Sequence, residues 1–351
     1  MASLLPHQID ELVDTTFNVL LKKKHWVDIS LDLQFYLTAE RFLRAKKRPM
    51  RGGPKMIWHA QVDNTRTARF TGLYARDQYE VKGLTVQAEQ QWALTTCNYT
   101  YDIDESVFQG DDQTTMIEDI KVREHSMMNS WFELLEEAFW TAPASSTEDP
   151  QPLYGIPFWI QKSATQGFNG GNPSGFSSGA ANIDVDSYSR WKNYTFGYDG
   201  ISRDDFINKW LTACEFCNFQ APHNFNRLDG KEPNWSFYTT WDVLESLHKF
   251  LDSRNDNLTD IAGLAGDATF KGIPVKRVPA LDQSEFAAYD STNPLYGVNW
   301  ATMDFFFQKQ RDMRRKKTEK NDMHNVRVVH TDSSCGLLCK NRRGNFVGRA
   351  N

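Results

Sequence analysis

The strongest constraint on the fold of this chain is a long stretch of helical periodicity between residues 116 and 140. Thr115 and Glu118 have the spacing of a capping box, so we expect the helix to begin beside them. At 1.5 Å per residue, this helix is about 37 Å long. An element of that length must act as a scaffold. Its apolar residues recur at intervals of three and four: Ile117, Ile120, Met127, Met128, Trp131, Leu134, Leu135, Ala138 and Phe139.

The residues before this helix have the two-residue period of β-strands. Residues 57–62 are expected to form one strand, and alternation extends over eleven positions from Ala93 to Ile103. A polar, turn-rich stretch at 70–79 lies between them. We therefore expect two long strands joined as an extended hairpin.

The first 55 residues combine patterns that do not make one compact unit. A helical period at 8–21 is followed by strict alternation at 27–35, which indicates a strand or an extended arm, and by a second helix at about 37–46. The breaker Gly52-Gly53-Pro54 ends this region. Such an arm buries its apolar residues against something other than itself.

Beyond the long helix, a stretch rich in Ser, Pro and Gly covers residues 141–182 and predicts a long loop. No internal repeat is visible, which disfavours solenoids and propellers. Shorter elements are expected along the rest of the chain: helices at 203–217, opened by Ser202 and Asp205, and at 240–253, a short buried strand within 271–281, an aromatic strand within 293–307, and a hairpin of Val326–Val329 with Leu337–Cys339.

Charge is distributed unevenly along the 351 residues. Residues 1–69 carry 12 Lys/Arg against 7 Asp/Glu, and residues 309–351 carry 12 against 4, whereas the remainder carries 16 against 34. Basic ends therefore flank an acidic body, although the net charge is only −5. This asymmetry favours a partner of opposite charge, either nucleic acid or the acidic body of a second copy, with two solvated basic segments as the alternative. The densest basic clusters are Arg44, Lys46, Lys47, Arg48 and Arg51, and Arg314, Arg315, Lys316 and Lys317.

The sequence contains no recognisable catalytic or nucleotide-binding motif. The sequence lacks a phosphate-binding loop, an H-E-x-x-H pair, a nucleophile elbow and a dinucleotide-binding glycine pattern. The adjacent carboxylates Glu136 and Glu137 are better explained by a solvated helix face than by acid–base catalysis. The 11 Trp and 23 Phe leave a carbohydrate-active enzyme as an alternative, but nothing selects its two carboxylates. We therefore predict no catalytic residue, no cofactor and no metal.

The five cysteines are expected to be reduced thiols. An export signal and an apolar stretch long enough to cross a membrane are both absent from the sequence pattern. Cys214 and Cys217 fall on the apolar stripe of the helix at 203–217, so core thiols are favoured over zinc ligands.

The order of segments resembles the major capsid protein of tailed bacteriophages with the Hong Kong 97-type shell fold. The resemblance covers residues 55–350 and depends on order and spacing more than on any one motif. It is carried by residues 70–112 before the long helix, by GIPFWIQ, GGNPSG and DSYSRWKNY within 155–194, and by FKGIPVKRVPALD and NPLYGVNWATMDFFF within 270–307.

The resemblance implies an α+β fold in five parts: an N-terminal arm (1–55), an extended loop with a peripheral-domain strand (56–110), a spine helix and peripheral domain (111–160), an apical domain (161–280), and a return to the peripheral domain with C-terminal strands (281–351). Tyr74, Arg76, Asp77, Lys82 and Gly83 would lie in the extended loop and contact a neighbouring subunit.

The implied function is self-assembly into an icosahedral shell around double-stranded DNA. The implied partners are copies of the chain in hexamers and pentamers, scaffolding and portal proteins, packaged DNA, and a decoration protein as an open alternative. Assembly would take place in the bacterial host cytoplasm, and the product would be the virion capsid. Lys82 could take part in a covalent crosslink, but no partner is identifiable, so a shell without crosslinks is favoured. Another phage structural or assembly protein is the alternative.

Overall fold

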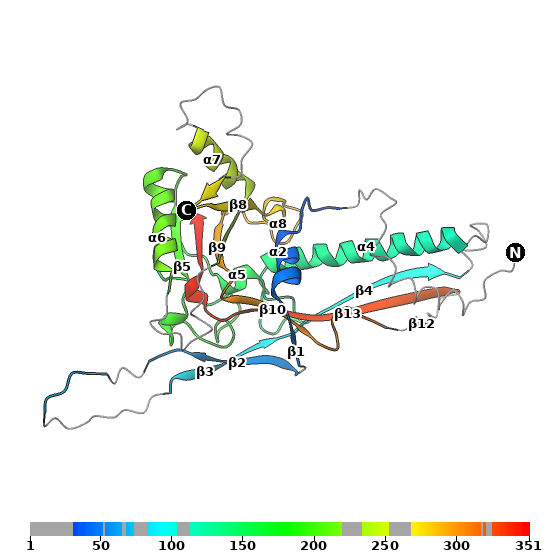
Figure 1. Ribbon diagram of the computed structural model, residues 1–351, viewed down its shortest axis with the longest axis horizontal. Helices are drawn as coiled ribbons and strands as arrows, with labels where there is room; N and C mark the ends of the chain where they lie inside the picture. The colour runs from blue at the N-terminus through cyan, green and yellow to red at the C-terminus, as the bar shows by residue number, and fades with distance from the viewer. Residues whose placement is uncertain are drawn as a thin grey trace.

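The computed structural model describes residues 31–51, 53–64, 68–73, 83–103, 113–219, 234–252, 268–316, 319–320 and 325–351. The predicted helix at 8–21 lies outside these residues. Two sheets, one long helix and a projecting hairpin make up the described part of the molecule (Figure 1). No described helix is both long enough and apolar enough to cross a membrane.

The first sheet is organised around one long strand, β13 (Val326–Cys339). It pairs with β4 (Ala93–Asp102) along ten positions and with β10 (Met303–Gln308) along five. The shorter members of this sheet are β1 (Lys47–Met50), β11 (Arg314–Arg315) and β12 (Glu319–Lys320). The strand β1 runs parallel to β10 and forms one edge.

The predicted hairpin of Val326–Val329 with Leu337–Cys339 is therefore wrong, because both halves belong to β13. The polar residues between them resemble a turn in sequence. In the structure, backbone pairing to β4 continues through them, and Thr95 Oγ1 and Cys97 Sγ donate to the carbonyls of Ser333 and Thr331. A polar run whose backbone stays paired to a neighbouring strand does not need to leave the sheet, even though the buried Ser334 hydroxyl has no hydrogen-bond partner among the described residues.

The second sheet has the order β5, β14, β9, β6, β8, β7. Its strands are β5 (Tyr194–Tyr198), β6 (Trp235–Thr239), β7 (Thr269–Phe270), β8 (Ile273–Arg277), β9 (Leu295–Asn299) and β14 (Phe346–Ala350). Helices α6 (Asn208–Phe216) and α7 (Trp241–Asp252) flank this sheet, close to the predicted ranges. The Ser202 hydroxyl accepts a hydrogen bond from the Asp205 N–H, as the predicted capping pair requires.

The aromatic segment 293–307 forms two strands instead of one. β9 belongs to the second sheet and β10 to the first, so these few residues connect the two sheets. Trp300, in the connecting turn, is fully buried and packs edge-on against Phe42 at 4.8 Å between ring centroids. This crossing joins the two sheets through a shared apolar core.

The long helix α4 extends over Gln113–Trp140 and lies alongside β4 and β13 (Figure 1). It begins before Thr115, so the prediction that a capping box at Thr115 and Glu118 starts the helix is wrong. Toward its C-terminal end, Trp131, Leu135 and Phe139 enter the largest core. Ile120 and Met127 form a smaller cluster with Tyr99, Tyr101 and Val329 at the other end.

A two-stranded ribbon projects from this body. β2 (Lys55–Gln61) pairs with β3 (Thr85–Gln91), and the described part of the tip between them comprises residues 62–64, 68–73 and 83–84 (Figure 1). We call β2, the tip and β3 the extended hairpin. The prediction that residues 93–103 form its second strand is wrong, because β4 pairs with β13. The true partner, β3, is a polar strand of Gln, Glu and Thr that has little apolar periodicity.

Short helices complete the described chain. They are α2 (Leu37–Arg41) with a π-helical turn at Phe42–Lys46, α5 (Ile156–Trp159), α8 (Pro279–Asp282), a π-helical turn at Arg203–Ile207, and 3-10 turns at Ser189–Trp191 and Arg342–Gly344. The predicted helix at 37–46 is thus confirmed. The five-part division of the chain stays a prediction.

Candidate assembly surfaces

Carboxylates of α4 accept hydrogen bonds from the segment that carries α2. One oxygen of Glu133 accepts hydrogen bonds from the Asp32 N–H at 3.0 Å and from the Tyr36 hydroxyl at 2.8 Å. Glu136 is fully buried and accepts from the N–H groups of Thr38 and Ala39 at the start of α2. The N-terminal segment is therefore attached to the scaffold helix by polar contacts as well as by apolar packing.

The prediction of a solvated Glu136/Glu137 pair is wrong. Glu137 accepts a hydrogen bond from the Ala287 N–H at 2.8 Å, and Glu136 also accepts one from the Trp140 indole N–H at 3.2 Å. Burial raises the pKa of Glu136, while the hydrogen bonds from Ala39, Thr38 and Trp140 oppose this rise. Two adjacent carboxylates look the same in a sequence whether they face solvent or accept hydrogen bonds from the backbone of a distant segment.

The base of the extended hairpin is fixed at several points. The Glu89 N–H donates to the Ala181 carbonyl, the Trp92 indole N–H donates to the Gly53 carbonyl, and Met56 packs where a side chain on Gly336 would lie. A hollow of about 270 Å³ remains between β3 and the loop 176–182, with Tyr154 and Phe158 among its lining residues. The base is thus ordered by the chain's own body.

The described part of the hairpin tip has no such support. Phe70 and Leu73 have relative exposures of 108% and 92%, the values of side chains without neighbours. Gly83 has open space where a Cβ would lie. Tyr74, Arg76, Asp77 and Lys82 lie outside the described residues. Sequence reasoning missed Phe70 and Leu73, because two isolated apolar residues in a turn-rich stretch form no helical or strand periodicity.

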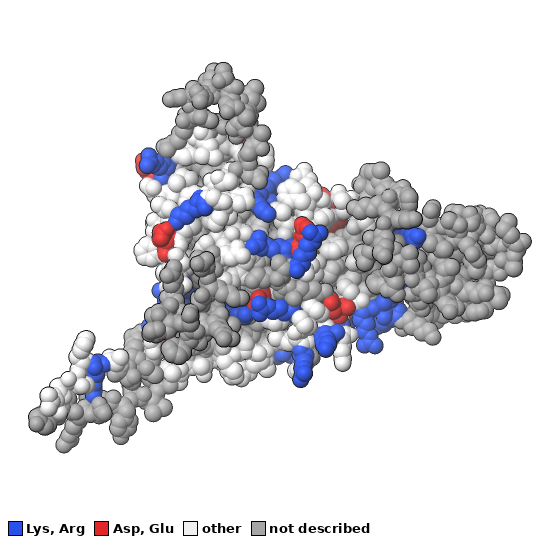
Figure 2. Space-filling view, in the orientation of Figure 1, with Lys and Arg blue, Asp and Glu red and all other residues white. Residues whose placement is uncertain are grey.

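The described members of the two basic clusters, far apart in sequence, lie along one edge of the first sheet. β1 carries Arg48 and runs beside β10, with Met50 opposite Gln308. The Lys309 N–H then donates to the Met50 carbonyl at 3.2 Å, and the chain continues into β11 with Arg314. Figure 2 shows Lys and Arg side chains gathered along the lower side of this region.

The members of the clusters differ in their surroundings. Arg44 is exposed and pairs with Glu40 on its own helix at 2.8 Å, while Arg48 reaches the buried carboxylate of Asp304 at 3.3 Å. Lys316 pairs with Asp332 at 3.2 Å, whereas Arg51 and Arg314 are exposed. The side chains of Lys46 and Lys47, and all of Lys317, lie outside the described residues.

Arg315 is an internal residue and not a surface cation. Its guanidinium lies 3.7 Å from Glu124 on α4 and donates to the Tyr99 hydroxyl at 3.0 Å. Burial raises the pKa of the Glu124 carboxyl, and Arg315 partly opposes this effect. Arg315 thus connects β11 to α4, and it should be removed from the set of residues available to a partner.

Two cations, the fully buried Arg342 and the half-buried Lys162, are held by polar groups of the chain's own body. Arg342 is fully buried, and its guanidinium donates to the carbonyls of Trp159 at 2.6 Å and Gly171 at 2.9 Å and to Asn193 Oδ1 at 3.3 Å. Burial lowers its pKa to about 10. Sequence reasoning missed this residue, because one arginine in a basic tail looks like a surface group.

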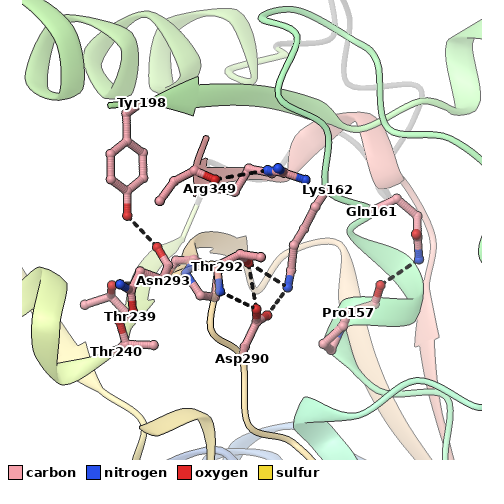
Figure 3. A network of polar contacts seen from close by, with 12 residues as sticks. Pro157, Gln161, Lys162, Tyr198, Thr239, Thr240, Asp290, Thr292, Asn293 and Arg349 are labelled. Carbon is pink, nitrogen blue, oxygen red and sulfur yellow. Dashed lines mark hydrogen bonds and ion pairs between the residues drawn. The ribbon is translucent and has the colours of Figure 1, made fainter. Parts of the chain in front are cut away.

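Lys162 forms the second site. Its ammonium contacts the carboxylate of Asp290 and lies 3.3 Å from Thr292 Oγ1, below the strand end that carries Arg349 (Figure 3). Burial, with a smaller effect from Arg349, lowers its pKa to about 8. The same network includes a hydrogen bond from the Tyr198 hydroxyl to the Asn293 carbonyl. All the contacts named here are made within the chain itself, and the network connects β5 to the turn before β9.

The cysteines lie in apolar surroundings. Cys214 and Cys217 are buried in the core of the second sheet, and burial raises the pKa of both thiols. The predicted core thiols are thus confirmed. Within the described residues, no group of three or more His, Cys, Asp or Glu side chains is arranged to hold a metal ion.

Comparison with known proteins identifies the architecture. No family model matches the chain, and no curated protein matches its sequence. The cyanophage A-1(L) capsid asymmetric unit contains a similar chain, with a TM-score of 0.60, 13% identity, and coverage of 96% of this chain and 98% of that chain. A chain in the capsid of a native GTA particle has a TM-score of 0.55 and 10% identity, and the match covers 95% of this chain and 96% of that chain. A chain in a structure of Gordonia phage Cozz has a TM-score of 0.52 and 12% identity, and the match covers 97% of this chain and 94% of that chain.

These similarities extend over almost the whole of each chain, so they concern the complete arrangement of arm, hairpin, long helix and two sheets. At 10–13% identity they establish the fold and carry no residue-level assignment. The fold predicted from the order of sequence segments is confirmed: this chain has the α+β fold of a phage capsid protein.

Proposed function

We propose that this chain is the major subunit of an icosahedral phage shell and that its function is self-assembly. The observation that carries the proposal is the extended hairpin with Phe70 and Leu73 fully exposed at its tip. A soluble monomer gains nothing from such side chains, since each apolar residue left in water forgoes about 1.5–3 kcal/mol of burial. A neighbouring copy that covers the tip would recover this energy.

The arrangement of supports favours the same function. The hairpin base and the described N-terminal segment that carries α2 are fixed to the body, whereas the described part of the tip, residues 68–73, lies away from it (Figure 1). The extended hairpin is fixed at its base and has exposed apolar side chains at its tip. Such an element is suited to a head-to-tail contact, in which one surface of a subunit meets a different surface of a second copy. Contacts of this kind close into rings, and rings of subunits can tile a shell.

The further partners belong to the same proposal. A shell of this type would be built of hexamers and pentamers, with scaffolding and portal proteins taking part in assembly and double-stranded DNA inside. The virion capsid would be its location, after assembly in the bacterial host cytoplasm. A structural role is supported by the similarity of this chain to chains of the cyanophage A-1(L) capsid and of the GTA capsid.

The test is co-expression of the chain with its scaffold, followed by electron microscopy and sedimentation. The wild type should form closed shells of one size. Phe70→Ser with Leu73→Ser should leave a soluble, folded subunit that forms no shells, while Phe70→Leu with Leu73→Phe, which keeps the tip apolar, should still assemble. A deletion of residues 72–84 should behave like the serine variant.

Two outcomes would contradict the proposal. Shell formation by the serine variant would show that the exposed tip is not the contact. A wild-type chain that stays monomeric under all assembly conditions would favour another structural or assembly protein, and turnover of a glycan by that monomer would favour the enzyme alternative.

A further inference from the structure

Two basic segments that are far apart in sequence, residues 48–51 and 309–316, build one basic surface along an edge of the first sheet. We define this basic ridge as Arg48, Arg51, Lys309, Arg311, Arg314 and Lys316. The backbone brings them together through the pairing of β1 with β10 and of β11 with β13. The ridge is therefore a product of folding, and neither cluster forms it alone.

The ridge is held rigidly by the strands and turns that carry it. The Arg311 N–H donates to the Gln308 carbonyl at 2.9 Å, the Ser334 N–H donates to the Arg311 carbonyl at 2.9 Å, and the Lys316 N–H donates to the His330 carbonyl at 2.8 Å. A surface fixed in this way presents its cations with little loss of backbone freedom on binding.

Carboxylates of the sheet orient part of the ridge without neutralising it. Asp304 is shared by Arg48 and Lys340, and Asp332 is shared by Lys316 and Arg311, so each carboxylate has two cations. Asp312 is the third acidic residue of this region. Among the described side chains, the six cations of the ridge and Lys340 thus stand against three carboxylates, a formal excess of four positive charges. Arg51, Lys309 and Arg314 are exposed and have no ion pair with any described carboxylate.

The composition of the ridge distinguishes between two kinds of partner. Protein interfaces have apolar, aromatic centres from which charged residues are depleted. The ridge has no such centre: the exposed residues between its cations are Pro49 and Gln310, and the large exposed apolar side chains of the described chain belong to other segments. Interfaces with nucleic acid are more polar and much more positive, and arginine forks match phosphate geometry.

We infer that the basic ridge binds the phosphate backbone of double-stranded nucleic acid without regard to sequence. Arg51, Lys309 and Arg314 make the direct phosphate contacts, and Arg48, Arg311 and Lys316 hold the surrounding potential positive. This inference goes beyond shell formation and does not require it, since the ridge is complete within one folded chain.

The test measures binding of the full-length, unassembled chain to a duplex of mixed sequence over a series of salt concentrations. The triple variant Arg51→Gln, Lys309→Gln, Arg314→Gln removes only cations without an ion pair, and thermal unfolding checks that it is folded. Its slope of log K against log salt should be smaller than that of the wild type by about 0.9 for each lost phosphate contact. The control is Arg203→Gln, Lys249→Gln, Lys271→Gln, which makes the same charge change beside the second sheet and should keep the wild-type slope. Since Lys249 and Lys271 pair with Glu245 and Glu215, thermal unfolding also checks that this control is folded.

Four results would overturn the inference: a wild type that does not bind duplex, a folded triple variant with an unchanged slope, an equal fall of the slope in the control, or a triple variant that binds DNA normally but forms no shells. The last result would assign the ridge to a contact between copies. Shell formation is measured separately, so a wild type that binds duplex through the ridge but never assembles would contradict the proposed function alone.

Discussion

The carboxylate of Glu136 lies 2.7 Å from the backbone nitrogen of Ala39, so the long helix supplies the N-terminal cap of a short helix 97 residues earlier in the chain. No side chain of the segment itself caps α2. The first N–H groups of a helix need acceptors, and a negative charge at that end is favoured by the helix dipole. Formation of α2 is thus coupled to its docking on α4.

We predict that Glu136→Gln destabilises the folded chain by about 1–3 kcal/mol at neutral pH, because an amide oxygen cannot serve all the donors that now share a carboxylate. The effect should depend on pH. The pKa of Glu136 is raised by burial, whereas in the unfolded chain a Glu titrates near about 4.3.

The folded state therefore binds more protons in this window, and the free energy of unfolding attributable to Glu136 falls as pH rises from the unfolded pKa through the raised one. The difference between wild type and variant in chemical denaturation should shrink over the same window. Glu245→Gln, on the exposed side of α7, controls for loss of charge. A difference that stays constant with pH would contradict this account of Glu136.

A second prediction concerns Gly297 in the middle of the second sheet. A Cβ at this position would lie 2.2 Å from ring carbons of the buried Phe346, and neither backbone nor ring has space to move. Gly297→Ala should therefore destabilise the fold by about 1–3 kcal/mol through overpacking. Gly200→Ala, where a Cβ meets nothing within 4 Å, should change stability by less than about 0.5 kcal/mol. Equal thermal unfolding of the two variants would show that the packing here is looser than the structure has it.

A third prediction concerns Arg342. Arg342→Ala leaves the oxygens of Trp159, Gly171 and Asn193 without this donor in a buried site, and each loss costs about 1–3 kcal/mol. We expect a total of about 3 kcal/mol or more by urea denaturation. Arg342→Lys should not restore stability, because one ammonium cannot reproduce the planar fork that reaches several acceptors. Full recovery with lysine would mean that charge alone matters here. Arg203→Ala is the exposed control.

Local patterns in the sequence predicted the elements whose stability is local. The long helix, the helices beside the second sheet and the strand at 93–102 all have one buried face, and a buried face leaves a period of 3.6 or 2 in the sequence. The order of these elements was enough to predict the α+β capsid fold.

Pairings between distant segments could not be predicted in this way. β3 has only Val86 and Ala88 as apolar residues, and the polar centre of β13 looks like a turn, so neither has a clear strand period. Glu136 and Arg342 resemble surface residues because their partners are backbone atoms of segments about 100 or more residues away. Backbone acceptors and donors have no signature in sequence.

The position of β13 and β14 has a consequence for the order of events during synthesis. β13 lies between β10 and β4, and β14 lies between β5 and β9, so the last 26 residues of the chain fill the middle of both sheets. A growing chain on the ribosome has its hairpin and long helix early, but neither sheet can close until β13 and β14 have been made. A chain that stops before residue 326 therefore lacks the central strand of each sheet, which makes it a substrate for proteases instead of a subunit that can enter a growing particle.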